Sequence, residues 1–182
     1  MSHFYAFTAL LSAKCNKATR IIGQITAWLT AVMALVTTSV VIARAFGIGS
    51  IWAQESVIYM HAAVLTAVSA YTLSDNGHVR VDIFYRRKLP LEQAWIDALG
   101  TVLFLLPLAL FTVFISWDFV VHSWQHAESS QNAGGISGVY WLKSLIIMNG
   151  GLLCLQAIAL LSRNILTLSF QNVEATQTKT HD

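Results

Sequence analysis

The chain is 182 residues long, with 55% apolar residues, 11% charged residues and a mean hydropathy of +0.59. A water-soluble domain normally carries about a quarter charged residues, so this composition excludes an ordinary soluble protein and indicates an integral membrane protein. The net charge is only +2 and the basic residues stand between apolar runs, which disfavours a nucleic-acid partner.

Residues 21–43 form the first apolar run, which contains no charged residue. At about 1.5 Å per residue, the run is long enough to cross a hydrocarbon core of about 30 Å. A signal peptide is the competing interpretation, because Ala43-Arg44-Ala45 has the small-residue pattern of a cleavage site, but a signal peptide has an apolar region of only about 7–15 residues. We therefore predict a retained spanning helix, preceded by a short surface-lying amphipathic segment within residues 1–20.

Three further apolar runs follow, at residues 51–73, 95–121 and 139–161. Pro107 lies in the middle of the third run and is expected to kink that helix, because proline has no backbone N–H. Residues 90–97 begin with proline and carry acids in the early turns, which is typical of a helix start and predicts a short interfacial helix. The pattern predicts one all-α membrane domain over residues 1–182, a bundle of four transmembrane helices with short loops and a polar tail at residues 164–182.

The distribution of basic residues predicts the orientation of this bundle. With both termini inside, nine Lys and Arg residues face the cytoplasm and only Arg44 and Lys143 face the outside. The nine are Lys14, Lys17, Arg20, Arg80, Arg86, Arg87, Lys88, Arg163 and Lys179. Such a bias follows the positive-inside rule, so we expect both termini in the cytoplasm of a multi-pass protein of the cell membrane.

Charged residues within the apolar runs are expensive in lipid and are therefore candidate functional residues. Glu55, Asp118 and Lys143 each lie three or four residues from an outer end of a run, so all three are expected at the outer rim. Two interpretations stay open: they pair with each other or reach water, or they meet charges on another membrane protein.

Two deeper polar residues, His61 and Gln156, are expected to make hydrogen bonds between helices. A bis-histidine haem is disfavoured, because the other histidines lie at or beyond the ends of the runs, far from the depth of His61. Cys15 and Cys154 predict neither a disulfide framework nor a metal site. Motifs for phosphate binding, serine hydrolysis or zinc catalysis are missing from the sequence, so we expect no enzyme activity and no cofactor.

Several strings in the sequence carry a resemblance to a known family. They are Trp52-Ala-Gln-Glu55 with Tyr59-Met-His61, the 77–82 string Gly-His-Val-Arg-Val-Asp, the 128–135 string Glu-Ser-Ser-Gln-Asn-Ala-Gly-Gly, and Tyr140-Trp-Leu-Lys143-Ser with Gln156. In this order around four spans, they resemble the small, DctQ-type membrane subunit of tripartite ATP-independent periplasmic (TRAP) transporters. One departure is that residues 136–139 read Ile-Ser-Gly-Val where a proline is expected before Tyr140.

The resemblance implies a protein of the bacterial inner membrane that pairs with a large permease subunit, which holds the sodium and substrate sites. It also implies a periplasmic binding protein that delivers the solute, often a carboxylate, and uptake driven by an ion gradient. The small subunit would then be a scaffold for the large one. A stand-alone four-helix exporter is the alternative function, followed by a haem or quinone anchor subunit.

The scaffold interpretation assigns roles to particular residues. Glu55, Asp118 and Lys143 would make rim contacts, and the outer loop at residues 128–135 would touch the binding protein unless it is a flexible linker. The inner-loop residues would form a structured motif unless the loop is merely solvated; they are His78, Arg80 and Asp82. Three basic residues would hold anionic lipid headgroups, at about 1 kcal/mol each; they are Arg86, Arg87 and Lys88.

Overall fold

The computed structural model of the protein describes residues 2–74, 85 and 87–179, and the described part is helical with no strand. Its elements are α1 (Ser2–Ala45), α2 (Ile51–Ser74), α4 (Pro90–Gly100), the π-helical turn η1 (Thr101–Leu105), α5 (Leu106–Gln125) and α6 (Val139–Lys179). The prediction of an all-α membrane bundle is confirmed.

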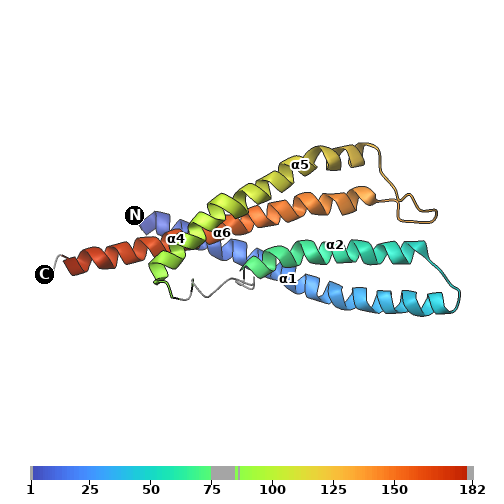
Figure 1. Ribbon diagram of the computed structural model, residues 1–182, viewed down its shortest axis with the longest axis horizontal. Coiled ribbons are helices and arrows are strands. Elements are labelled where there is room, and N and C mark those ends of the chain that lie inside the picture. The colour runs from blue at the N-terminus through green and yellow to red at the C-terminus, as the bar shows by residue number, and fades with distance from the viewer. Residues whose placement is uncertain (1, 75–84, 86, 180–182) are drawn as a thin grey trace.

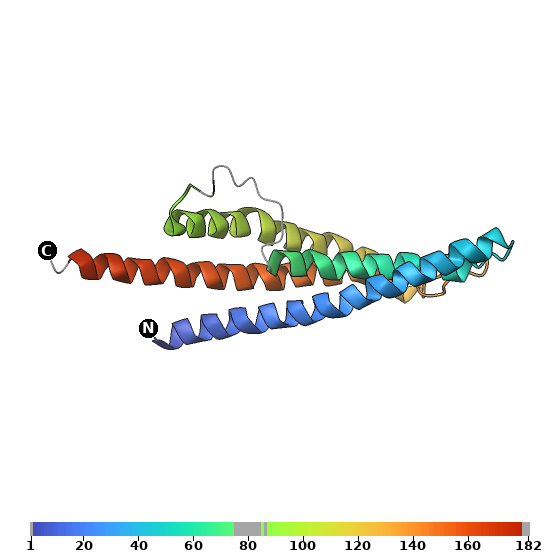
Figure 2. The same ribbon diagram turned by 90° about the horizontal axis from the view of Figure 1, so that it is seen from below.

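Two antiparallel hairpins make up the bundle: α1 with α2, and α5 with α6 (Figure 1). The links at residues 46–50 and 126–138 lie at the same end, which we call the loop end. Both chain termini and the start of α4 lie at the opposite end, which we call the terminal end. Helix α6 contacts α1, α2, α4 and α5, and Figure 2 shows it between α1 and α4 at the terminal end. Helix α6 therefore joins the two hairpins.

Within the described residues, four helical segments are long and apolar enough to cross a membrane: Ala13–Ala45, Ile51–Leu73, Leu91–Gln125 and Val139–Leu168. Their order matches the four predicted apolar runs, although three of the segments are longer than the run. In the 18-residue stretch that marks each segment as apolar, at most 28% of the residues are buried within the chain. Most of each helix surface is therefore available to lipid or to another protein.

Two local features differ from what the sequence pattern predicts. Helix α1 is continuous from Ser2 to Ala45, so the segment expected to lie on the membrane surface is instead the first part of a long helix. Pro107 follows the π-helical turn η1, in which the Leu106 N–H donates to the Thr101 carbonyl. Because proline cannot donate and clashes with the preceding turn, the irregularity expected at Pro107 is found just before it.

Small residues form the contacts between the helices. Ala109 and Ala157 have no exposed surface, and a Cβ added at Gly150 would lie 3.1 Å from the Ala109 carbonyl oxygen and 2.6 Å from a Val113 methyl carbon. Side chains this small let two backbones approach closely, which is how helices associate where lipid removes the hydrophobic driving force. The α5–α6 contact therefore depends on a glycine.

Candidate functional site at the loop end

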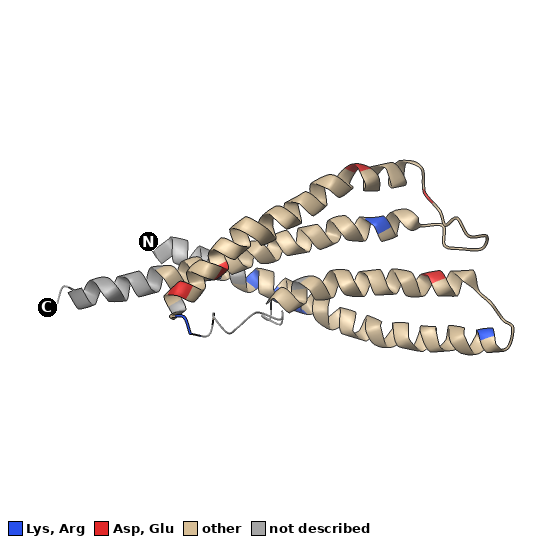
Figure 3. Cartoon of the chain, viewed as in Figure 1, with Lys and Arg blue, Asp and Glu red and all other residues tan. Residues whose placement is uncertain are grey.

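In the described part of the chain, the charged residues lie toward the two ends of the bundle, and the stretch between them is nearly free of charge (Figure 3). The described charged residues at the loop end are Arg44, Glu55, Asp118, Glu128 and Lys143. This end combines charges of both signs with a loop of 13 residues between α5 and α6, and it is the candidate site.

Glu55, near the start of α2, is bonded to the α5–α6 loop. Its Oε1 accepts hydrogen bonds from the Ser130 hydroxyl and from Asn132 Nδ2, the latter at 2.9 Å. Its Oε2 accepts the Ile136 backbone N–H at 2.6 Å. We call these four residues the loop clamp, and it ties the loop of the second hairpin to a helix of the first.

Gly135 provides the space that the loop clamp needs. A Cβ at this position would lie 2.5 Å from Ser130 Oγ and 2.7 Å from Glu55 Oε1, closer than real Cβ contacts allow. The neighbouring Gly134 has a φ of +81°, a left-handed conformation that glycine adopts without steric cost. These two glycines let the chain fold back over the carboxylate.

The loop is also closed by its own backbone hydrogen bonds. Ser130 N–H donates to the Ile136 carbonyl at 3.1 Å, and Val139 N–H donates to the Glu128 carbonyl at 3.0 Å. An aromatic contact supports its two ends, because the rings of Trp124 and Tyr140 lie 4.5 Å apart. The residues at the tip of the loop, 131–134, are exposed. The loop is thus an ordered surface at the end of the bundle.

Lys143 forms a second interaction at this end. Its ammonium group pairs with the Glu128 carboxylate and lies 3.9 Å from the centre of the Phe119 ring. A pocket of about 580 Å³ opens here. Its lining consists of Asp118, Phe119, His122, His126, Glu128 and Lys143. Among the described residues, Asp118 has no hydrogen bond or ion pair.

The three predicted rim residues therefore lie at one end but do not bond to one another. Glu55 binds the loop, and Lys143 binds Glu128. Sequence reasoning missed Glu128, Ser130 and Asn132 as partners. The string that contains them was part of the family resemblance, but neither the Glu55 pairings, which span 75 and 77 positions, nor the Lys143 pairing, which spans 15, can be read from spacing.

The Glu128 pair predicts a dependence of loop order on pH. The hydrogen bond from Lys143 holds the pKa of Glu128 below its ordinary value of 4.5. The pair's stabilisation is therefore fully present above pH 4.5 and is lost as the pH falls through the lowered pKa. We expect amide exchange of the loop, corrected for intrinsic rates, to be constant from pH 7 to 5 and to rise only in more acidic solution. In the Glu128→Gln protein, the acid-induced rise should be smaller; an equal rise in both proteins would contradict the assignment.

At the terminal half of the bundle, Gln156 of α6 binds two residues of α1. Its Oε1 accepts from the Thr19 hydroxyl at 3.2 Å, and its Nε2 donates to Asn16 Oδ1 at 3.0 Å. Gln156 and Thr19 are each only 1% exposed. His61, the other deep polar residue, lies on the exposed side of α2 and makes no hydrogen bond among the described residues. Gln156 thus bridges two helices of this chain, whereas His61 does not.

We predict that Gln156→Leu destabilises the bundle by about 1–2 kcal/mol, because Asn16 loses its partner and the two helices lose their bridge. The change should appear as a lower midpoint of thermal unfolding in detergent. Gln24→Leu is the matched control, because Gln24 is exposed on α1 and makes no hydrogen bond among the described residues. Equal midpoints for the two variants would contradict the role of the bridge.

The polar stretch before α4 is described only in part. His78, Arg80, Asp82 and Arg86, for which roles were predicted, lie outside the described residues. Arg87 is exposed and makes no ion pair within the described part of the chain.

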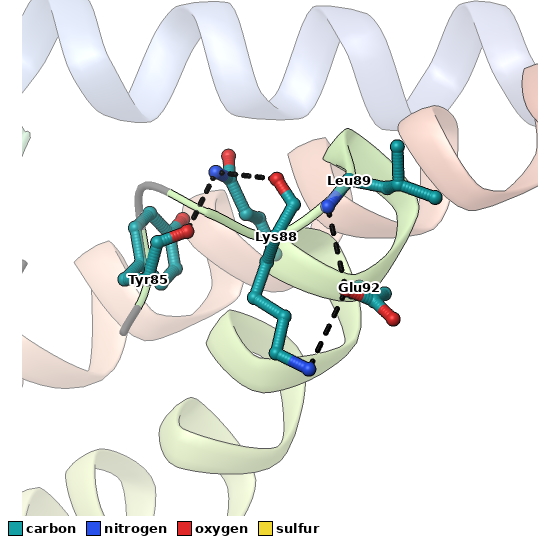
Figure 4. Close-up of polar contacts among 5 residues, drawn as sticks. Tyr85, Lys88, Leu89 and Glu92 are labelled. Carbon is teal, nitrogen blue, oxygen red and sulfur yellow. Dashed lines mark hydrogen bonds and ion pairs between the residues drawn. The ribbon is translucent and has the colours of Figure 1, made fainter. Parts of the chain in front are cut away.

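Lys88, the third predicted lipid anchor, lies in the turn just before α4 (Figure 4). Its ammonium lies 3.6 Å from Glu92, and its carbonyl accepts from Gln93 Nε2 at 3.1 Å. Glu92 also accepts the Leu89 N–H at 3.3 Å, which satisfies one of the free donors at the helix start. About half of the Lys88 side chain remains exposed.

The described residues contain no group of three or more His, Cys, Asp or Glu side chains that could hold a metal ion. In comparisons with known proteins, a family model described as "Tripartite ATP-independent periplasmic transporters, DctQ component" matches residues 32–167. That range contains the loop clamp, the Lys143 pair and the greater part of both hairpins. No curated protein and no solved structure matches the chain.

Proposed function

Because the chain belongs to the DctQ family of small components of TRAP transporters, we propose that it is the scaffold subunit that braces a large permease subunit. The transporter would take up a carboxylate-type solute, delivered by a periplasmic binding protein and driven by an ion gradient. The observation that carries the scaffold role is the loop clamp, which joins the two hairpins at the end where the links at residues 46–50 and 126–138 lie.

The polar groups within the helices support a scaffold role more than a transport pathway through this chain. Two of them make bonds between helices: Gln156 accepts from Thr19, and Ser69 donates to Asn149 at 2.7 Å. Glu55 is the acid that an exporter would need, and its carboxylate accepts hydrogen bonds from three donors of the loop. These bonds argue against the stand-alone exporter.

In the proposed orientation, the terminal end faces the cytoplasm and the loop end faces the periplasm of the inner membrane. The described basic residues at the terminal end support it under the positive-inside rule; they are Lys14, Lys17, Arg20, Arg87, Lys88 and Arg163. The ordered loop tip at residues 131–134 would then face the binding protein, and Arg87 would reach anionic headgroups.

The test is affinity purification of this chain from its native membrane in mild detergent, followed by reconstitution with whatever co-purifies. We expect a stoichiometric large permease and solute uptake that needs both subunits, a binding protein and an ion gradient. If the chain purified alone and moved solute by itself in liposomes, the exporter would replace the scaffold.

A further inference from the structure

Helix α2 packs against α1 and α6 and leaves its remaining side uncovered. Exposed residues follow one another along that side at intervals of seven, three, four and three positions, and together they form a single stripe. Its members are Ile51, Ile58, His61, Leu65 and Val68. Ile58 and Leu65 are 57% and 58% exposed, so the centre of the stripe is bare in the isolated chain. We call this surface the α2 stripe.

His61 is the one polar residue of the α2 stripe, and its position makes contact with lipid costly. It lies ten residues after the start of α2, about 15 Å from the loop end and nearly as deep as a spanning helix allows. An imidazole carries at least one N–H donor and cannot leave both nitrogens unbonded in hydrocarbon without a penalty. The side chain is too short to reach the membrane surface from this depth, and acyl chains offer it no partner.

The spacing of the α2 stripe indicates what covers it. Apolar residues that repeat at three and four positions are the pattern by which one helix packs along another. The covering element must therefore be a helix with a polar side chain at the depth of His61. A second copy of this chain would have to bring two His61 side chains together across a two-fold axis, and the cross-linking experiment below distinguishes that arrangement from a different partner.

We propose that the α2 stripe is the docking surface for a membrane helix of the large permease subunit, and that His61 hydrogen-bonds to a carboxamide, hydroxyl or carboxylate on that helix. This inference rests on the proposed scaffold function and adds the face that makes the contact. His61 is then a recognition residue between chains.

The first experiment places a photo-reactive benzophenone amino acid at Ile58 or Leu65 in cells that also express the tagged large subunit. Irradiation should join the two subunits covalently from both positions. Adducts to a second copy of this chain alone, or no adduct while the two subunits still co-purify, would overturn the inference and leave the scaffold function standing. If the unmodified subunits did not co-purify at all, the scaffold function itself would fail.

The second experiment compares His61→Leu with His61→Gln. Leucine removes the hydrogen bond, and we expect the retained large subunit to fall about threefold to tenfold in washes of increasing detergent. Glutamine keeps a donor and an acceptor and should retain most of it. Unfolding of the isolated small subunit should be the same for both variants and the parent, because His61 bonds to nothing within the described chain. Equal retention by His61→Leu and the parent would overturn the inference.

Discussion

Replacing Glu55 by glutamine should free the α5–α6 loop from α2 and cut solute uptake by the assembled transporter about tenfold or more. The carboxylate only accepts hydrogen bonds, and all its partners in the loop clamp are donors. A glutamine side chain presents one acceptor and one NH₂ group, so a donor would face a donor and the loop would be pushed away.

Hydrogen exchange measures the loop directly, because the Ile136 amide is one of the donors. We expect exchange at this amide to quicken about tenfold or more in Glu55→Gln as the loop opens. Gln54→Ala is the neighbouring control, because the Gln54 side chain makes no hydrogen bond among the described residues. Unchanged exchange at Ile136 in Glu55→Gln would show that the clamp does not hold the loop.

Gly135→Ala tests the clamp from the loop side, because its new methyl group would collide with Ser130 and the Glu55 carboxylate. It should reproduce the faster exchange without removing any charge. Gly138→Ala is the control, since a Cβ there would have its nearest contacts at 3.6 and 3.7 Å, which is ordinary packing. If both glycine variants behaved alike, crowding at Gly135 would not be the cause.

Gly150→Leu should be the most destabilising single change within the bundle, at roughly 2–3 kcal/mol. The added side chain would meet Val113 at its first atom and the backbone carbonyl of Ala109 next, and a backbone atom cannot rotate away. Helices α5 and α6 would have to separate, which would also pull the Glu128 and Lys143 pair apart.

The matched control is the next residue, Gly151→Leu, where an added Cβ meets nothing within 4 Å. Both variants add the same side chain and the same helix propensity, so their difference reports packing alone. We expect a large drop in the unfolding midpoint for Gly150→Leu and little change for Gly151→Leu. Similar midpoints would refute the close approach of the two helices.

Apolar runs were enough to predict the four spanning segments, because the cost of an unsatisfied backbone in lipid leaves a helix as the solution. They did not predict where α1 begins. Residues before Arg20 are mixed in polarity, and they join the helix because Thr19 and Asn16 bond to Gln156 on a helix far along the chain. Such a contact between distant segments has no local pattern in the sequence.

The candidate site was predicted in its position but not in its bonding. The cost of charge in lipid marks Glu55 and Lys143 as functional candidates. Their partners, Ser130 and Glu128, depend on how a glycine-containing loop folds over the carboxylate, and that path is set by contacts among all its residues. For His61, the sequence predicted a hydrogen bond to another helix, but no donor or acceptor of the described chain bonds to it.

The unequal lengths of the spanning segments have a consequence for the surrounding bilayer. Ala13–Ala45 has 33 residues and Ile51–Leu73 has 23, so at about 1.5 Å per residue the first exceeds the second by about 15 Å although they share a hairpin. A segment longer than the hydrocarbon thickness must tilt, project into the headgroups or thicken the lipid beside it. The extra length at the start of Ala13–Ala45 carries Lys14, Lys17 and Arg20, so this part of the segment would project into the headgroups. The first hairpin would then contact lipid headgroups along its longer helix at a level where its shorter helix has already ended.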